Sequence, residues 1–138
     1  MSYDQFQSGV VVYYPYLWAR EADRGETSGR KSRPVVVTIR VVRAGKPDLF
    51  ALLPITTQPP ASGRIASKIP DTEKRRAGLE TSLEQWIMLD EYNAEILPGT
   101  YYLEPQKPLG RFGDAYLRPL LTDFLARITK VASVKRAD

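Results

Sequence analysis

The sequence predicts a mainly β domain of the α+β class, with a short helical insert and a C-terminal amphipathic helix. Short runs rich in Val, Ile, Leu and Tyr alternate with turn signals that contain Gly and Pro. A polar segment near the middle has helix-capping residues at both ends, and the end of the chain places apolar residues at helical spacing. At 138 residues we expect one domain over 1–138, with loose ends at 1–8 and 133–138.

The first strand is predicted at 9–18, and Pro15 interrupts it because proline cannot donate a ladder hydrogen bond. The charged segment 19–31 (AREADRGETSGRK) follows and is predicted to be a loop, since it contains two glycines that permit turns. Long ordered loops of this kind are often functional.

The most informative stretch begins at Arg33 and Pro34. The residues after Pro34 are mostly β-branched as far as Ile39, without the alternation of a half-exposed strand, so we expect a strand buried on both faces. Pro34 suits the first position of such a strand, and it biases Arg33 toward an extended conformation. This places the permanently charged Arg33 guanidinium at the start of the strand, where its N–H donors could bind a phosphate.

Shorter elements are predicted further along the chain. In order they are a strand at 49–53 running into Pro54–Pro60, a short strand at 63–69, a helical turn at 71–78 with Asp71 as N-cap and Gly78 after its end, and a strand at 85–89. The Lys74-Arg75-Arg76 run in the helical turn is interpreted mainly as a solvated face.

The last element is predicted to be a packing helix. Its apolar face has helical spacing, Pro119 suits a first turn, and Arg127 and Lys130 suit the C-terminal end. The apolar positions are Leu117, Leu120, Leu121, Phe124, Leu125, Ile128 and Val131.

Composition excludes several kinds of chemistry. The chain has no Cys and no His, so it has no disulfide, no thiolate nucleophile, no Cys/His zinc site and no imidazole acid or base. Any reaction must use Arg, Lys, Asp, Glu, Tyr, Ser or Thr. No signal peptide and no apolar run of about 20 residues is present, so we expect a cytoplasmic protein without a membrane partner.

Positive charge is concentrated in one part of the chain. The formal net charge is +4, and the segment 20–46 holds eight basic residues against three acidic ones. Such a balance favours a polyanionic partner.

Three blocks of sequence resemble, in the same order, the PemK/MazF family of bacterial toxins. They are Gly9-Val10-Val11, then Arg24-Gly25-Glu26-Thr27 leading to Arg33-Pro34-Val35-Val36-Val37, then Pro54-Ile55-Thr56-Thr57-Gln58. Val10 stands where the family usually has an acidic or polar residue. Some relatives use a His or an Arg–Asp arrangement for proton transfer, and this chain has no His.

The resemblance implies a small SH3-like β-barrel, a homodimer, and an endoribonuclease that cuts single-stranded RNA without a metal or other cofactor. It also implies an acidic antitoxin as the protein partner. On this resemblance Arg33 and Thr56 are the catalytic pair. We expect Arg33 to stabilise charge on the scissile phosphate and Thr56 to hydrogen-bond a phosphate oxygen or the attacking 2′-hydroxyl.

Six further residues are candidates for RNA contact. Arg30 and Lys31 would bind flanking phosphates, and Trp18 would stack an unpaired base or else belong to the core. Gln58 would read a base edge or else bond the backbone of its loop. Glu26 would act as a base or, more simply, as an acceptor that orders the loop, and Thr57 completes the set.

Three alternatives stay open at this stage. The barrel could grip a protein such as DNA gyrase, although the end of the chain offers no aromatic anchor. It could bind nucleic acid without cutting it. It could also be a metal nuclease that uses Asp90, Glu91 and Glu95, although their spacing fits no metal motif.

Overall fold

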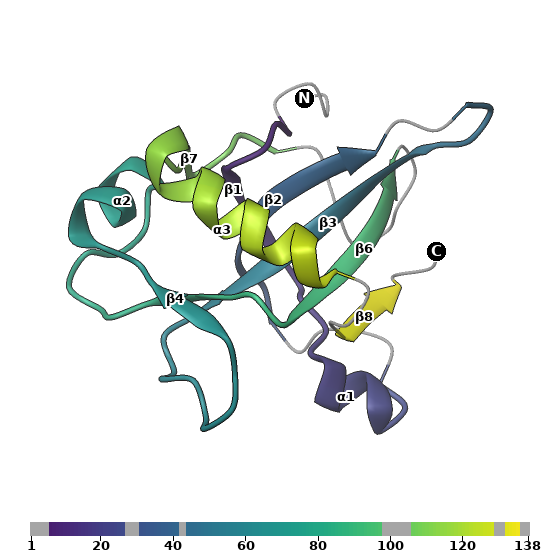
Figure 1. Ribbon diagram of the computed structural model, residues 1–138, viewed down its shortest axis with the longest axis horizontal. Helices are drawn as coiled ribbons and strands as arrows, with labels where there is room; N and C mark the ends of the chain where they lie inside the picture. Colours follow the sequence, from purple (N-terminus) through teal and green to yellow (C-terminus); the bar gives the residue numbers. More distant parts are fainter. Residues whose placement is uncertain (1–5, 27–30, 42–43, 98–105, 129–131, 136–138) are drawn as a thin grey trace.

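The computed structural model describes residues 6–26, 31–41, 44–97, 106–128 and 132–135. Within these ranges it is a mainly β, α+β structure with a curled, largely antiparallel sheet (Figure 1). The strands are β1 (Val10–Tyr14), β2 (Arg33–Val41), β3 (Asp48–Thr56), β4 (Ala66–Lys68), β5 (Trp86–Met88), β6 (Glu91–Leu97), β7 (Gly110–Arg111) and β8 (Ala132–Lys135). The helices are α1 (Ala19–Asp23), α2 (Asp71–Arg76) and α3 (Asp114–Arg127). The predicted fold class is therefore confirmed at this level.

Strands β2 and β3 form the centre of the sheet. The order is β4-β5-β3-β2-β1-β7, and β6 pairs with β3 on one side and with β8, in parallel, on the other. Val35, Val36 and Val37 are at most 1% exposed, which confirms that β2 is buried on both faces. A bulge at Thr38 shifts the register between β2 and β3, and the Thr38 hydroxyl donates to the Ala51 carbonyl at 2.9 Å.

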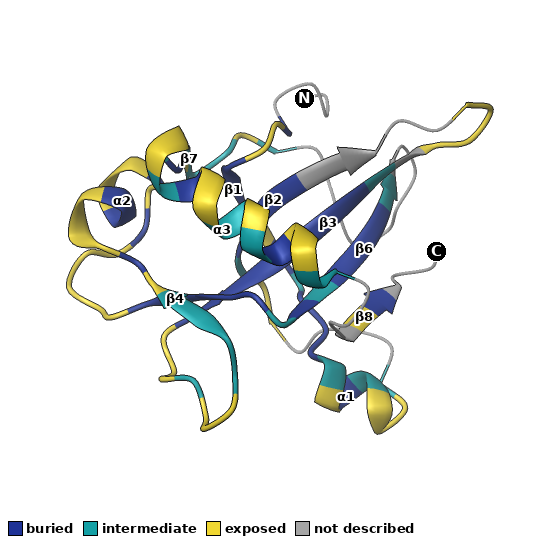
Figure 2. Ribbon diagram, viewed as in Figure 1, coloured by how far each residue is buried: buried dark blue, intermediate teal, exposed yellow. Residues whose placement is uncertain are grey.

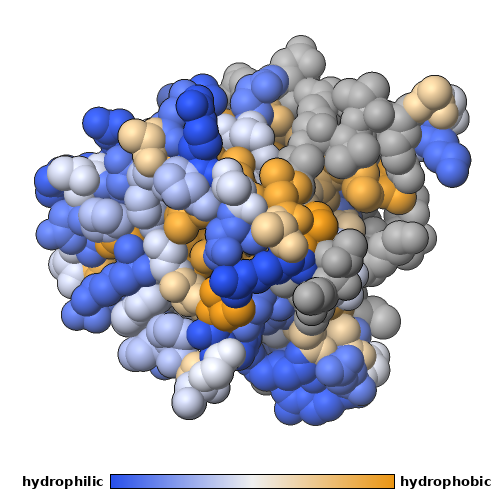
Figure 3. All heavy atoms as spheres, in the orientation of Figure 1, coloured by the Kyte–Doolittle hydropathy of each residue, from blue (hydrophilic) through white to orange (hydrophobic). Residues whose placement is uncertain are grey.

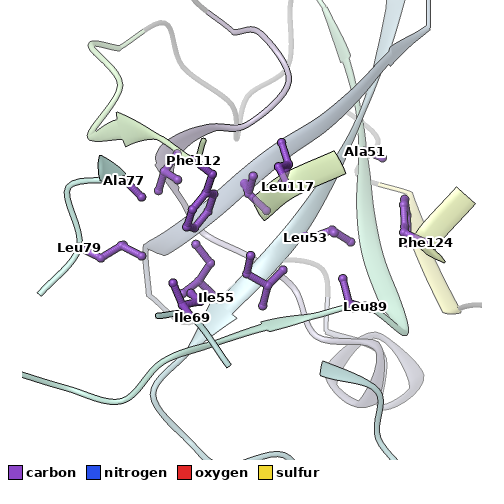
Figure 4. Close-up of a cluster of buried hydrophobic side chains, with 13 residues drawn as sticks. Ala51, Leu53, Ile55, Ile69, Ala77, Leu79, Leu89, Phe112, Leu117 and Phe124 are labelled. Carbon is purple, nitrogen blue, oxygen red and sulfur yellow. The ribbon is translucent and has the colours of Figure 1, made fainter. Parts of the chain in front are cut away.

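Two hydrophobic clusters lie on opposite faces of this sheet. Along β2, Val35 and Val37 belong to one cluster, together with Trp18 and Met88, whereas Val36 belongs to the other. The second cluster packs beneath α3, which crosses the sheet and contributes Leu117 (Figures 1 and 4). Dark blue along the central strands in Figure 2 shows the same two-sided burial. In Figure 3 hydrophobic residues form small patches near the middle of the view, and hydrophilic residues cover most of the remaining described surface.

Helix α2 is fixed against the start of α3 by close backbone contact. The Gly113 N–H donates to a Glu73 carboxylate oxygen at 2.8 Å, just before α3 begins. A Cβ atom at Gly110 would lie 2.3 Å from the Arg76 carbonyl oxygen, so only glycine fits there. Glu73 thus satisfies the N–H of the N-cap residue of α3.

The helices differ from the sequence prediction in four details. Residues 19–23 form α1, where the whole of 19–31 was predicted to be loop; the Glu21 carboxylate accepts the Trp18 N–H at 3.1 Å and stabilises this turn. The N-cap of α2 is Pro70 and not Asp71. Helix α3 begins at Asp114, so Pro119 lies inside it and not in its first turn. Leu125 is 49% exposed and does not pack, although Leu117 and Phe124 do; Lys130 and Val131 lie outside the described residues.

The Lys74-Arg75-Arg76 run also needs correction. Arg75 and Arg76 are exposed as expected, but Lys74 is buried. Its ammonium group donates to the carbonyls of Thr81 and Leu83 at 3.1 and 2.8 Å. Lys74 therefore fixes the loop that follows α2.

The sequence prediction missed three strands, β6, β7 and β8, and the buried position of Phe6. Strand β6 follows β5 almost directly, and its inward residues Glu91, Asn93 and Glu95 are polar, which hid the apolar alternation of a strand. Strand β8 places residues 133–135 in the sheet, where a loose end was expected. At the other end Phe6 is fully buried in the core, so the expected loose start does not extend to this residue.

No helix in the described part of the chain is long and apolar enough to span a membrane.

Candidate functional site

The register of β2 and β3 brings Arg33 and Thr56 together. The two strands pair Val35 with Pro54, and continuing that register to the strand ends places Arg33 opposite Thr56. Alternation puts both side chains on the sheet face of Val35 and Leu52. The two residues predicted as a catalytic pair, 23 positions apart in the sequence, thus line one pocket.

The pocket, here called the Arg33 pocket, has a volume of about 230 Å³. One wall comes from Trp18 and Arg20 at the start of α1, and another from Arg33 and Thr56 at the strand ends. The turn 58–61, Arg64, and Met88 of β5 complete it. Four residues predicted for the site, Trp18, Arg33, Thr56 and Gln58, therefore meet here.

The Arg33 guanidinium lies in a partly dehydrated environment. It is half-buried, and within the described residues its buried Nε has no hydrogen-bond partner. Burial lowers the pKa of Arg33 from its ordinary value; the nearby positive charge of Arg20 acts in the same direction, and the Glu21 carboxylate opposes it. An anion that enters the pocket stabilises this partly dehydrated cation.

Trp18 supports the guanidinium groups of this pocket. The Arg33 guanidinium carbon lies 5.1 Å from the Trp18 ring centroid, and that of Arg20 lies 4.9 Å from it. Both distances are within the range of cation–π attraction. Tyr16 packs against the same ring in an edge-on arrangement at 5.1 Å. Trp18 is only 6% exposed, so it belongs to the core, and its ring faces these neighbours and not an incoming base.

Buried side chains of β6 hold the segment that carries Trp18. The Asn93 side chain accepts the Leu17 N–H at 2.9 Å and donates to the Leu17 carbonyl at 2.8 Å. The Glu91 carboxylate accepts the Ala19 N–H at 2.7 Å. These three bonds replace strand pairing after Pro15 ends the regular strand, and they fix Trp18 in position.

The end of β3 turns sharply after Thr56. The Gln58 backbone N–H donates to the Thr56 hydroxyl oxygen at 3.0 Å, which closes a side-chain turn before Pro59. Thr56 is 7% exposed, and its hydroxyl hydrogen is still able to point into the pocket. Thr57 and Gln58 are exposed; Gln58 lines the pocket, whereas Thr57 does not.

Arg64 was missed by sequence reasoning, although it lines the pocket. Its guanidinium binds Asp90 through two hydrogen bonds of 2.7 and 2.8 Å, and Glu91 at 3.3 Å. The pKa of Arg64 is raised, chiefly by the hydrogen bond to Asp90. Burial alone would raise the pKa of Asp90, but the hydrogen bonds from Arg64 and from the Ile65 N–H leave it below its usual value. Arg64 therefore lines the pocket with its positive charge already paired to Asp90 and Glu91.

The remaining predicted residues lie away from the pocket. Lys31 is exposed, and Glu26 is half-buried at the end of α1, where its N–H donates to the Glu21 carbonyl at 3.1 Å. Neither lines the pocket. Arg30 lies outside the described residues.

The metal-nuclease alternative finds no support in the side-chain geometry. Among the described residues no group of three or more carboxylates, imidazoles or thiols is arranged to hold a metal. Asp90 and Glu91 instead bind Arg64.

Comparison with protein-family models, curated proteins and solved structures gave no match for this chain.

Proposed function

We propose that this chain is a toxin-like, metal-independent endoribonuclease with an SH3-like barrel, similar to the PemK/MazF family. Single-stranded RNA is its substrate and the Arg33 pocket its active site. The proposal extends to a cytoplasmic homodimer whose activity a cognate acidic antitoxin blocks. Support for the proposal comes from the sequence blocks that contain Arg33 and Thr56 and from the Arg33 pocket that these residues line.

One observation carries the proposal. Arg33 and Thr56, which the sequence singled out from two separate blocks, line one pocket with a partly dehydrated guanidinium and a hydroxyl donor. That pairing fits a phosphodiester, whose oxygens accept from both groups. RNA supplies its own nucleophile, so the absence of Cys and His from the sequence is no obstacle.

The chemical step is an attack by the 2′-hydroxyl. The 2′-oxygen bonds to phosphorus, its proton passes to water, the bond from phosphorus to the 5′-oxygen breaks, and that oxygen takes a proton from water. The products are a 2′,3′-cyclic phosphate and a 5′-hydroxyl. Arg33 stabilises the charge that builds on the phosphate oxygens, and Thr56 donates to one of them.

The test is incubation of the purified protein with a long single-stranded RNA in EDTA, followed by mapping of the new ends. We expect discrete cuts that end in 2′,3′-cyclic phosphate, and a loss of about 100-fold or more in Arg33→Ala, as for removal of one transition-state donor. Thr56→Ala should lose activity as well. Arg118→Ala is the matched control, because Arg118 is exposed on α3, which packs on the opposite face of the sheet.

Two results would overturn the proposal. One is a folded wild-type protein that leaves every RNA intact. The other is an Arg33→Ala, Thr56→Ala double variant that cuts at the parental rate.

One observation favours the second candidate, a barrel that binds nucleic acid without cutting it. Within the described residues no carboxylate lines the Arg33 pocket, and the neighbouring Asp90 is bound to Arg64. A general base is thus missing from the pocket itself. Salt-sensitive RNA binding without cleavage would establish this candidate. The gyrase-gripping alternative has no comparable support, since β8 places Val134 in the sheet.

A further inference from the structure

The segment between β1 and α1 is held by buried side chains after strand pairing has ended. The last residue pair between β1 and β2 is Tyr14 with Arg33, and α1 begins at Ala19. Between these points Asn93 binds both backbone groups of Leu17, accepting its N–H at 2.9 Å and donating to its carbonyl at 2.8 Å. One planar carboxamide thus takes the place of a neighbouring strand and fixes the orientation of this backbone.

Asn93 is a rigid origin for these two bonds. It is fully buried, and β6 pairs it with Leu52 of β3 on one side and with Val134 of β8 on the other. Because its backbone is held from both sides, the carboxamide has little freedom to move. The backbone of Leu17 is therefore held at a fixed distance from the centre of the sheet.

The position of the Leu17 backbone is passed to Arg33 by one aromatic ring. Trp18 follows Leu17 directly, and its ring centroid lies 5.1 Å from the Arg33 guanidinium carbon. Within the described residues the buried Nε of Arg33 has no hydrogen-bond partner, so no hydrogen bond at this atom fixes the guanidinium. A change in the backbone path at Leu17 therefore moves the ring and the guanidinium that stacks on it.

We propose that Asn93 is a positioning residue for Arg33, acting through the backbone and the ring between them. Asn93 itself does not line the Arg33 pocket. The inference rests on the proposed function and deepens it, because it names a residue outside the pocket that the cleavage step requires. Thr56 is placed separately, by the pairing of β3 with β5, so Asn93 should act on Arg33 and not on Thr56.

Asn93→Asp tests the proposal because the hydrogen bonds that the new side chain can make depend on pH. A protonated carboxyl donates to the Leu17 carbonyl and accepts the Leu17 N–H, as the carboxamide does. A carboxylate only accepts, so it repels the Leu17 carbonyl. Acid should therefore restore the wild-type arrangement in this variant, and base should remove it.

The surroundings of position 93 favour the protonated form of an introduced carboxyl. Glu91 and Glu95 lie two residues before and after it on the same buried face of β6. Arg64 is the cation that binds Glu91, and Tyr16 stays neutral because burial raises its pKa well above the ordinary value. The paired neighbours in β3 and β8, Leu52 and Val134, do not titrate. Burial and two like charges therefore raise the pKa of the introduced carboxyl, which brings its titration closer to neutral pH.

The measurement is the cleavage rate of a short RNA from about pH 5 to about pH 9, with each rate divided by that of the wild type at the same pH. We expect a ratio near one in acid and a fall of about tenfold once the carboxyl ionises, because small misplacement of a catalytic group is costly. The loss should appear in kcat while KM changes by less than about twofold, since Arg33 acts in the transition state.

A double-mutant cycle shows whether the effect passes through Arg33. In Arg33→Ala protein, Asn93→Asp should change the rate by less than about twofold, whereas in Thr56→Ala protein it should keep its full pH-dependent effect. Tyr92→Leu is the matched control, because Tyr92 lies on the opposite face of β6 and packs edge-on against Phe124 at 5.5 Å. This variant weakens the packing of β6 away from Asn93, and its kcat should equal that of the wild type.

Asn93→Ser keeps the proposal testable if Asn93→Asp does not stay folded at high pH, which thermal unfolding measures. A serine hydroxyl is shorter and bonds at most one of the two Leu17 groups. We expect a loss of kcat at every pH, and this loss should again disappear in Arg33→Ala protein.

Trp18 emission separates this inference from the cleavage test. Trp18 and Trp86 are the two tryptophans of the sequence, so a Trp86→Phe background isolates Trp18. If the wild type cuts RNA but the Asn93 variants cut like it, or lose as much activity in Arg33→Ala protein, the inference is overturned and the proposed function stands. If the wild type leaves RNA intact, the proposed function fails and emission decides: a pH-dependent shift in Asn93→Asp that the wild type lacks supports the positioning, and no shift overturns it.

Discussion

Two arginines line the same pocket under opposite conditions. Arg64 is held by two hydrogen bonds to Asp90 and a further contact with Glu91, which raise its pKa. Arg33 stacks on Trp18, has a buried Nε without a partner among the described residues, and has a lowered pKa because it is partly buried. The difference teaches which arginine serves structure and which is available to a ligand. A satisfied guanidinium stabilises the protein, whereas a partly dehydrated one stabilises what binds to it.

The largest expected effect is on the unfolding free energy, which tests whether Arg64 and Arg33 differ in their contribution to stability. Asp90→Ala leaves the Arg64 guanidinium without its bidentate partner. Since the side chains of Arg64 and Asp90 are only 32% and 18% exposed, we expect a loss of about 2 kcal/mol, below the 3–5 kcal/mol of a fully buried pair. Arg33→Ala should cost about 1 kcal/mol or less, because it removes the cation–π contact with Trp18 but breaks no ion pair within the described residues. Urea unfolding of both variants measures this, and equal losses would show that the two arginines do not differ in role.

The contrast between these arginines also shows what sequence can predict. Arg33 was found because its signals are local: Pro34 and the β-branched residues after it define a strand start, and the arginine must precede it. Thr56 was singled out by the resemblance of the block Pro54-Ile55-Thr56-Thr57-Gln58, which follows an apolar run. Arg64 and Asp90 are 26 residues apart, and no local pattern connects them.

The missed elements have a physical reason of their own. Strand β6 carries Glu91 and Asn93 inward, which contradicts the rule that strand interiors are apolar. These side chains are accommodated because they bind the backbone of Leu17 and Ala19 after Pro15 ends β1. Only the folded structure shows that the polar side chains of β6 form hydrogen bonds with the backbone that follows β1. The eight strands and three helices of the described residues confirm the mainly β, α+β class, while an SH3-like barrel stays a prediction.

Substitutions at Trp18 test whether the contact between its ring and the Arg33 guanidinium contributes to cleavage. Trp18→Leu keeps an apolar side chain but removes the aromatic face, so we expect cleavage to fall by about fivefold, in line with a cation–π contribution of about 1 kcal/mol. Trp18→Phe should restore part of this loss, because it retains a ring. The measurement compares kcat and KM on a short RNA, with thermal unfolding alongside. Equal loss in Leu and Phe variants would indicate a packing effect instead.

Acid should weaken the contribution of the Arg64–Asp90 ion pair to the unfolding free energy. The pKa of Asp90 lies below its ordinary value of 3.8, so the pair adds stability above that pH and loses it as the pH falls through the lower native value. The gap in unfolding free energy between wild type and Asp90→Asn should thus be largest near neutral pH and shrink in acid. Glu91, whose pKa is raised by burial, is present in both proteins. Urea unfolding near pH 6 and pH 3 supplies the comparison, and a constant gap would contradict it.

The smallest expected effect is that of Arg20→Ala on the salt dependence of RNA affinity. It is exposed and stacks on the same tryptophan as Arg33, and within the described residues it forms no ion pair with a carboxylate. If it contacts a flanking phosphate, Arg20→Ala lowers the slope of log affinity against log salt by about 0.7, the value for one contact with a single strand. The exposed Arg118 supplies the matched control, and Arg118→Ala should leave the slope unchanged. A slope unaffected by Arg20→Ala would show that Arg20 contacts no phosphate, and Arg33 would then be the phosphate contact among the two arginines that stack on Trp18.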